Sequence, residues 1–209
     1  MASRRETSPV REHRPIAQRR AQLLTAAAEV MREQGVAAAT TRAIAERAGL
    51  PHGSVHYCFG TKTALLRAVV QSEVDRSVER AWRRAAGSTD LEGVLRGVLE
   101  AQLDSVREDP GHHAMLDELI ALARRDPALA DLPGWEHERY VSAATDLISE
   151  LPTTIGLDLA RPAREIATMI MVLAAGLSDL WTATENRSEL DRALDDCVRG
   201  LAARLSRPA

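Results

Sequence analysis

Polar side chains that can hydrogen-bond to base edges or to phosphates are concentrated between residues 41 and 62 of this 209-residue chain. Arginine can form two parallel hydrogen bonds to a guanine, and imidazole can donate to an acceptor on a base. Hydroxyl and ammonium groups bind phosphate without reading the base sequence. This group of side chains therefore indicates nucleic-acid binding; its members are Thr41, Arg42, His52, Ser54, His56, Tyr57 and Lys62.

Two short helices at 40–48 and 52–58 are expected to position these side chains. Thr40 is a good N-cap for the first helix, and Gly49 ends it. Two short helices joined by a tight turn form a helix-turn-helix, whose second helix enters the major groove of DNA. Its inward contacts are expected from apolar residues, namely Ile44, Ala45, Ala48, Leu50, Val55 and Phe59.

The individual side chains also have less specific interpretations. We interpret Arg42 as a DNA contact rather than a solvated helix residue, whereas for His52 both interpretations stay open. For His56, packing or phosphate binding is favoured over base reading. Ser54 and His56 could form a nucleophile and base, but the short helix offers no oxyanion motif and no orienting acid, so we expect no catalysis.

Metal and disulfide chemistry are not indicated. His112 and His113 are adjacent, so on a helix they point about 100° apart and cannot clamp one ion together. A role at a helix terminus is the simpler interpretation. Cys58 and Cys197 lie far apart in the sequence and outside any Cys/His cluster, so both are interpreted as ordinary thiols.

The charge distribution supports DNA binding by one end of the chain. Residues 1–62 carry ten Lys and Arg against five Asp and Glu, while residues 63–209 carry 17 against 25. The two parts therefore have net charges of +5 and −8. We expect a cytoplasmic protein, because no run approaches about 18 uninterrupted apolar residues and the first 20 residues are Arg-rich.

The rest of the chain predicts an all-α fold of about nine helices. Apolar residues make up 45% of the chain but aromatic residues only 3%, so the core must consist mainly of Ala, Leu, Val and Ile. Thr61, Thr89 and Ser188 are the expected N-caps, and Pro127 and Pro162 are expected in first helical turns. The remaining helices are expected at 17–34, 61–86, 89–109, 112–125, 127–151, 162–185 and 188–205.

Residues 19–70 resemble the tetracycline-repressor (TetR) family. The departures are His56, where the family usually has Tyr, and Cys58, where it often has an aromatic residue or His. The resemblance implies that Arg42 and His52 reach base edges and that Thr41, Tyr57 and Lys62 hold phosphates. It is carried by Leu23, Leu24, Ala27, Val30, Met31, Gly35, Thr40, Ile44, Ala45, Ala48, Gly49, Gly53, Phe59, Lys62, Leu65 and Leu66.

The resemblance implies three parts: a basic arm at 1–15, a DNA-binding domain at 16–62, and a ligand-binding and dimerisation domain at 63–209. Arg4, Arg5, Arg11 and Arg14 of the arm can contact DNA or stay solvated. The family's last two helices pair with a partner subunit. Residues 169–177 are apolar nearly all round, which fits burial on two sides, and Ala174 is the residue we expect in that interface.

The resemblance also implies a cavity for a small, largely apolar effector, with no metal or other cofactor. Its expected wall consists of large or polarizable residues among small ones, with two histidines as polar anchors: Met115, Leu119, Trp135, Tyr140, Met169, Trp181, His112 and His113. The hypothesis is a dimeric repressor that binds a palindromic operator and is released by the effector. The alternatives are a helical-bundle enzyme and a DNA-binding protein without a ligand.

Overall fold

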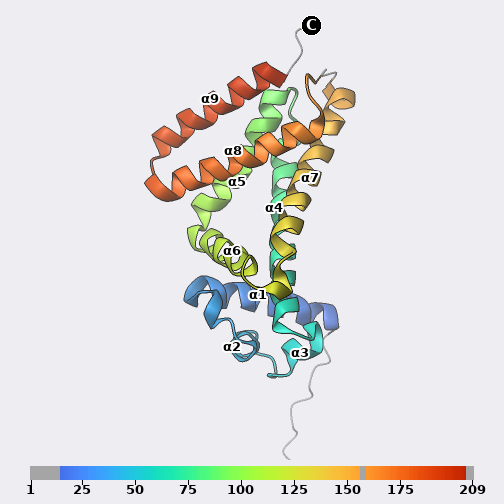
Figure 1. The fold of residues 1–209 in the computed structure, drawn as a ribbon, viewed down its shortest axis with the longest axis vertical. Helices are drawn as coiled ribbons and strands as arrows, with labels where there is room; N and C mark the ends of the chain where they lie inside the picture. Colours follow the sequence, from blue (N-terminus) through green and yellow to red (C-terminus); the bar gives the residue numbers. More distant parts are fainter. Residues whose placement is uncertain (1–14, 156–158, 206–209) are drawn as a thin grey trace, which may run out of the picture.

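The computed structural model describes residues 15–155 and 159–205, and these ranges contain nine α-helices, two short 3-10 helices and no β-strand (Figure 1). The all-α prediction is confirmed, whereas the arm with Arg4, Arg5, Arg11 and Arg14 lies outside the described residues. The elements are α1 (Ile16–Gln34), η1 (Val36–Ala38), α2 (Thr41–Arg47), α3 (Ser54–Phe59), α4 (Lys62–Ala85), α5 (Leu91–Glu108), α6 (Pro110–Ala123), η2 (Pro127–Leu129), α7 (Leu132–Ile155), α8 (Ala163–Thr184) and α9 (Arg187–Leu205).

Two hydrophobic clusters share the helix α4. The first joins α1, α2 and α3 to the part of α4 that ends at Val74, and it also takes in Met115 and Leu119 of α6. The second joins the end of α4, at Ala85, to α5, α7, α8 and α9. Figure 1 shows α2 and α3 at one end of the molecule and α8 and α9 at the other, with α4 and α7 running between them. The two clusters thus meet along α4, beyond residue 62.

The predicted caps of the two helices that flank the recognition segment are confirmed. Thr40 Oγ1 accepts a hydrogen bond from the backbone N–H of Ala43 at 3.1 Å, and Thr61 Oγ1 accepts one from Ala64 at 3.0 Å. Both caps satisfy amides that have no partner within the helix. They fix where α2 and α4 begin, and hence how the residues next to them face.

The predicted starts of α5 and α9 are wrong because another side-chain acceptor lies one or two residues from each chosen residue. Asp90, not Thr89, caps α5 by accepting from the N–H of Gly93 at 2.7 Å. Asn186, not Ser188, accepts from the N–H of Glu189 at 3.2 Å at the start of α9. In each case the true cap is a residue whose side-chain carbonyl or carboxylate oxygen reaches the third residue onward.

Three further helix boundaries near prolines differ from the prediction. Pro127 begins the short 3-10 helix η2, and α7 starts five residues later at Leu132. Pro110 is the first residue of α6, which was expected to start at residue 112, and Asp109 caps that helix by accepting from the N–H of His112 at 2.9 Å. Pro162 is the residue before α8 and not its first residue. A proline is compatible with all of these positions, so its presence alone does not choose among them.

The helix α8 is apolar on two faces. By length and composition it could cross a membrane. In this structure one of its faces, with Ile170 and Leu177, is buried in the second cluster. Its outer face includes Val172, which is 68% exposed. The high hydropathy of α8 is thus explained by one face in the core and a second face that residues 15–155 and 159–205 leave uncovered at Val172.

Candidate DNA-binding face and effector cavity

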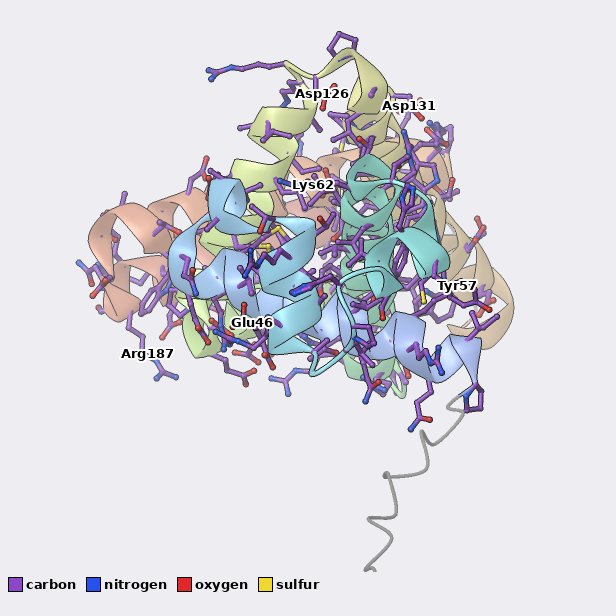
Figure 2. The ribbon with its side chains drawn as sticks, turned by 90° about the horizontal axis from the view of Figure 1, so that it is seen from below. Glu46, Tyr57, Lys62, Asp126, Asp131 and Arg187 are labelled. Atoms are coloured by element: carbon purple, nitrogen blue, oxygen red, sulfur yellow. The ribbon has the colours of Figure 1, made fainter. Side chains whose placement is uncertain are left out.

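The turn between α2 and α3 gives the DNA-binding segment its shape. Gly49 has a φ of 64°, a left-handed conformation that favours glycine, and the N–H of Leu50 returns to the carbonyl of Ala45 at 2.9 Å. Ile44 and Ala45 are fully buried beneath the turn. Figure 2 looks at the molecule from the side of α2 and α3, with Glu46, Tyr57 and Lys62 labelled.

Most of the predicted DNA contacts are on the surface of this segment. Tyr57 is 67% exposed and stands among the largest exposed hydrophobic side chains. Thr41 and Arg42 open α2, His52 lies in the turn, and all three are exposed. His56 is also exposed, on α3. A face that offers a guanidinium, imidazoles and hydroxyls to solvent has the donors needed for both base edges and phosphates.

The prediction that Ser54 faces outward is wrong. Ser54 is 8% exposed, as is Cys58, which lies four residues further along α3. Residues four apart share one face of a helix, so Ser54 belongs to the same inward face as Cys58. The six-residue helix α3 therefore offers its outward side chains from His56 and Tyr57 rather than from Ser54.

Lys62 is the first residue of α4. The first turn of a helix has unpaired N–H groups and the positive end of the helix dipole, so it attracts anions. The only lysine of the chain adds its ammonium to that turn. This combination suits one phosphate of a DNA backbone.

Arg20 and Arg47 make contacts that link α1 to α3 and α2, so their guanidinium groups are not free to bind DNA. Arg20 donates a hydrogen bond to the carbonyl of Cys58, and its guanidinium lies 4.1 Å from the centre of the Phe59 ring. Arg47 donates to Glu33 at 2.9 Å, which ties α2 to α1. These bonds hold the orientation of α2 and α3 against the rest of the domain.

A cavity of about 670 Å³ lies between α4, α5, α6, α7 and α8. One part of its wall is apolar, and another part is lined by ionisable side chains. The size is within the range of small-molecule sites in proteins. The wall consists of Glu73, Ser77, Val78, Arg80, Ala81, Trp82, Val98, Ala101, Gln102, Ser105, His112, His113, Leu116, Asp117, Ile120, Ala121, Arg124, Glu136, Tyr140, Ala143, Ala144, Leu147, Ile170, Met171, Ala174, Ala175, Ser178 and Asp179.

A buried carboxylate joins two walls of the cavity. Glu73 of α4 is 5% exposed; its Oε2 lies 2.9 Å from Nε2 of His112 on α6, and Arg76 pairs with its other oxygen. Glu73 is thus partnered on both oxygens, as a buried charge must be. The contact links α4 to α6 across the cavity wall.

Two further wall residues on α7 have displaced pKa values. Burial raises the pKa of Glu136, while the charge of Arg124 lowers it and that of Asp117 raises it further. Burial likewise raises the pKa of Tyr140 to about 12, opposed by a hydrogen bond with Ser77. Tyr140 therefore stays neutral at physiological pH, whereas Glu136 is a carboxylate that its surroundings stabilise poorly.

The helix α6 connects this cavity to the DNA-binding end. The carboxylate of Glu118 accepts a hydrogen bond at 3.1 Å from the backbone N–H of Val36, the first residue of η1, which precedes α2. At the start of α6, Asp109 accepts from Arg32 of α1 at 2.9 Å. Because α6 also contributes His112 and Asp117 to the cavity wall, one rigid element touches both functional regions.

Comparison with known proteins identifies the family. Residues 23–69 match the family model described as "Bacterial regulatory proteins, tetR family", and residues 92–206 match "BetI-type transcriptional repressor, C-terminal". The activator FasR of Mycolicibacterium smegmatis is 30% identical over 185 residues, which cover 88% of this chain and 82% of FasR. The chain belongs to the TetR family. It is a DNA-binding transcriptional regulator, and the enzyme alternative is not supported.

Other TetR-family proteins agree over most of the chain. The nicotine-responsive repressor HdnoR of Paenarthrobacter nicotinovorans is 28% identical over 160 residues, covering 77% of this chain and 81% of HdnoR. The crystal structure of a TetR-family regulator from Rhodococcus sp. superposes with a TM-score of 0.75 at 23% identity and covers 91% of this chain and all of that one. The helical body behind the helix-turn-helix thus has the fold of this family.

The structure brings together three of the eight predicted effector contacts: His112, His113 and Tyr140 line the cavity. The other five lie elsewhere. Met115 and Leu119 are buried in the first cluster, and Trp135 packs against it. Trp181 packs against the second cluster beneath the guanidinium of Arg107, and Met169 lies on the outer face of α8.

Other cavity residues were missed although the sequence contained a signal for one of them. Glu73 stands at a position of α4 where helical spacing from Val69 and Val70 predicts an apolar residue. An acid inside such a stripe is expensive to bury and marks a special environment. Glu136 and Trp82 have no such signal, because only the packing of distant helices places them on the wall.

The prediction that Ala174 lies in the dimer interface is wrong, because the sequence did not show which way this residue faces. Ala174 is 9% exposed and lines the cavity, so it faces the inside of its own subunit. The outer face of α8 and α9 is a shallow groove that includes Met169, Val172, Leu173 and Leu201. A helix apolar all round gives no indication of which side a given alanine faces.

Proposed function

We propose that this protein binds a palindromic operator as a homodimer in the cytoplasm, represses transcription, and is released by a small molecule that enters the cavity. TetR-family regulators bind operator DNA, typically as dimers. Relatives differ in their effect on transcription, since HdnoR is named a repressor and FasR an activator. The repressor assignment follows the match of residues 92–206 to a repressor family.

The observation that carries the proposal is the continuity of α4. This helix begins at Lys62 on the DNA-binding face and reaches the cavity wall with Glu73, Ser77 and Trp82. A ligand that fits better when α4 is tilted would change the separation of the two recognition helices, which must stay near one turn of DNA, about 34 Å. DNA binding would then weaken without contact between ligand and DNA.

Individual DNA contacts are assigned from exposure and chemistry. Arg42 and His52 are proposed to reach base edges, while Thr41, Tyr57 and Lys62 hold phosphates. Replacing Lys62 with Ala should weaken binding to all sequences alike and reduce the salt slope by about one. Arg42→Ala should instead cost about 1–3 kcal/mol on the specific site and relax base preference.

The test is titration of both variants against specific and scrambled duplexes at several salt concentrations, using an operator selected from a random DNA pool. Each variant serves as the control for the other. A Lys62→Ala protein that loses specificity while keeping its affinity for scrambled DNA would overturn the phosphate assignment. An enzyme, or a protein without operator preference, would yield no enriched sequence in the selection.

The homodimer is proposed to form through the outer face of α8 and α9. The support is the exposed apolar groove that contains Val172, which a symmetric partner could cover. Val172→Arg should produce monomers in sedimentation and lose operator affinity. Ala114→Arg, a change at another exposed position, on α6, is the control and should stay dimeric. A dimeric Val172→Arg protein with unchanged affinity would place the interface elsewhere.

The ligand response separates this proposal from a DNA-binding protein without a ligand. HdnoR is named nicotine-responsive, and this chain has a cavity of suitable size. A coupling of about 1–3 kcal/mol between effector and operator is expected, and it must be reciprocal. Calorimetry of a bound effector with and without operator should give different affinities, and equal affinities would refute the allosteric mechanism.

A further inference from the structure

We infer that the cavity is built for an organic cation, with its ammonium group beside Glu136 and Asp117 and its apolar body along Trp82, Leu147 and Ile170. The inference rests on the proposed ligand response and specifies the chemical class of the effector. It follows from the distribution of charge and of apolar surface along the cavity wall.

The wall is divided into a polar and an apolar part. On α7, residues 136, 140, 143, 144 and 147 share one face, and this face changes from Glu136 and Tyr140 to Ala143, Ala144 and Leu147. Asp117 of α6 and Arg124, the residue that follows α6, interact electrostatically with Glu136, so this segment adds further charge to the polar part. An elongated ligand with one charged end and an apolar body matches this gradient.

The charge of the wall is unbalanced toward acid. Four carboxylates and two guanidiniums line it, and among the carboxylates Glu73 is already paired with Arg76 and contacts His112. Asp117 and Asp179 are exposed. Glu136 is the partly buried acid for which the described residues provide no hydrogen-bond donor. A carboxylate in that situation is stabilised when a cation arrives.

An aromatic ring adds to the attraction at the polar part of the wall. Tyr140 lies one turn beyond Glu136 on the same face of α7. The face of such a ring attracts an ammonium group when water is excluded. The combination of a poorly stabilised acid and a neutral phenol favours a cation over a neutral or anionic ligand of the same shape.

Arg80 allows the opposite ligand charge to be tested in the same cavity. It is a half-buried guanidinium on the wall with no acidic partner among the described residues, so an anionic ligand would use it. A long arginine can keep its charged end hydrated while its stem lines the cavity, which the shorter Glu136 cannot do. If the ligand is a cation, neutralising Glu136 must therefore lower its affinity, whereas neutralising Arg80 must leave that affinity unchanged or raise it.

The experiment measures binding of three probes of equal chain length by calorimetry: hexyltrimethylammonium, 1-hexanol and hexane-1-sulfonate. The full-length protein should bind the ammonium probe at least about tenfold more tightly than the sulfonate. Glu136→Gln should reduce affinity for the ammonium probe about tenfold and leave that for 1-hexanol unchanged. Arg80→Gln should leave the affinity for the ammonium probe unchanged or raise it. Thermal melting verifies that both variants are folded.

Three results would overturn the inference: tighter binding of the sulfonate, loss of ammonium binding only in Arg80→Gln, or failure of all three probes to bind. Operator titration keeps the proposed function separate. Bound ammonium that leaves operator affinity unchanged would refute the proposed regulation while supporting the ligand class. Intact operator binding without any bound probe would refute the ligand class while leaving the DNA-binding function in place.

Discussion

The hydrogen bond between Glu118 of α6 and the N–H of Val36 provides a direct test of how the two ends of the molecule are connected. Val36 is 1% exposed and its N–H is bonded to the Glu118 carboxylate, so removing that carboxylate takes away the acceptor of a buried donor. A hydrogen bond to a charged group contributes about 1.5–3 kcal/mol, and partial exposure of Glu118 reduces this. We expect Glu118→Ala to lower the free energy of unfolding by about 1–2 kcal/mol.

For a chain of this size such a change lowers the melting temperature by about 2–8 °C, measured at one fixed protein concentration. Glu118→Gln keeps an oxygen acceptor and is the matched control, so it should lose less than half as much. The Ala variant should also show a smaller effect of bound effector on operator affinity, because α6 no longer holds the segment before α2. A melting temperature within 1 °C of the unchanged protein would refute this reasoning.

Three further predictions concern packing, pH and the recognition helix. Gly97→Ala should destabilise the protein by about 1–3 kcal/mol in denaturant titration, because its Cβ would lie 2.9 Å from the carbonyl oxygen of Arg84; an unchanged midpoint would show that α4 and α5 separate freely. Glu136→Gln should raise the melting temperature at pH 7.5. Because the pKa of Glu136 is raised in the folded protein, the ionised carboxylate destabilises the fold at pH values above that pKa. The gain in melting temperature should therefore disappear as the pH falls below about 4, the pKa of Glu in the unfolded chain. A gain that does not depend on pH would refute this reasoning. Arg20→Ala should weaken operator binding, because α3 loses its attachment at Phe59, and a titration with unchanged affinity would contradict this role.

The helix-turn-helix could be predicted from the sequence because its determinants are local. The caps at Thr40 and Thr61 and the turn at Gly49 each act within a few residues, and the structure contains all three. Ser54 was misjudged because α3 is too short for its pattern to fix an inward face. The predicted start of a helix was wrong where two possible N-cap residues are adjacent, as with Thr89 and Asp90.

The cavity could be predicted only in part because five helices from distant parts of the chain form it. His112, His113 and Tyr140 were found as polar or aromatic residues in apolar surroundings. The search for large or polarizable residues among small apolar ones, which found Tyr140, also selected Met115 and Leu119, and these fill the core beneath the DNA-binding segment. Sequence pattern separates inside from outside, but it does not separate a packed interior from the wall of a cavity.

The contribution of α4 and α6 to the hydrophobic cluster under α2 and α3 has a consequence for building chimeric biosensors. A graft made at residue 62 would remove Leu65, Val69 and the α6 side chains Met115 and Leu119, all of which fill the core under α2 and α3. The transferred helix-turn-helix would then lack the side chains that fill its hydrophobic core. A functional hybrid must therefore exchange only the cavity-facing residues of α4 and α6 and keep the opposite sides of both helices from the parent that supplies the operator specificity.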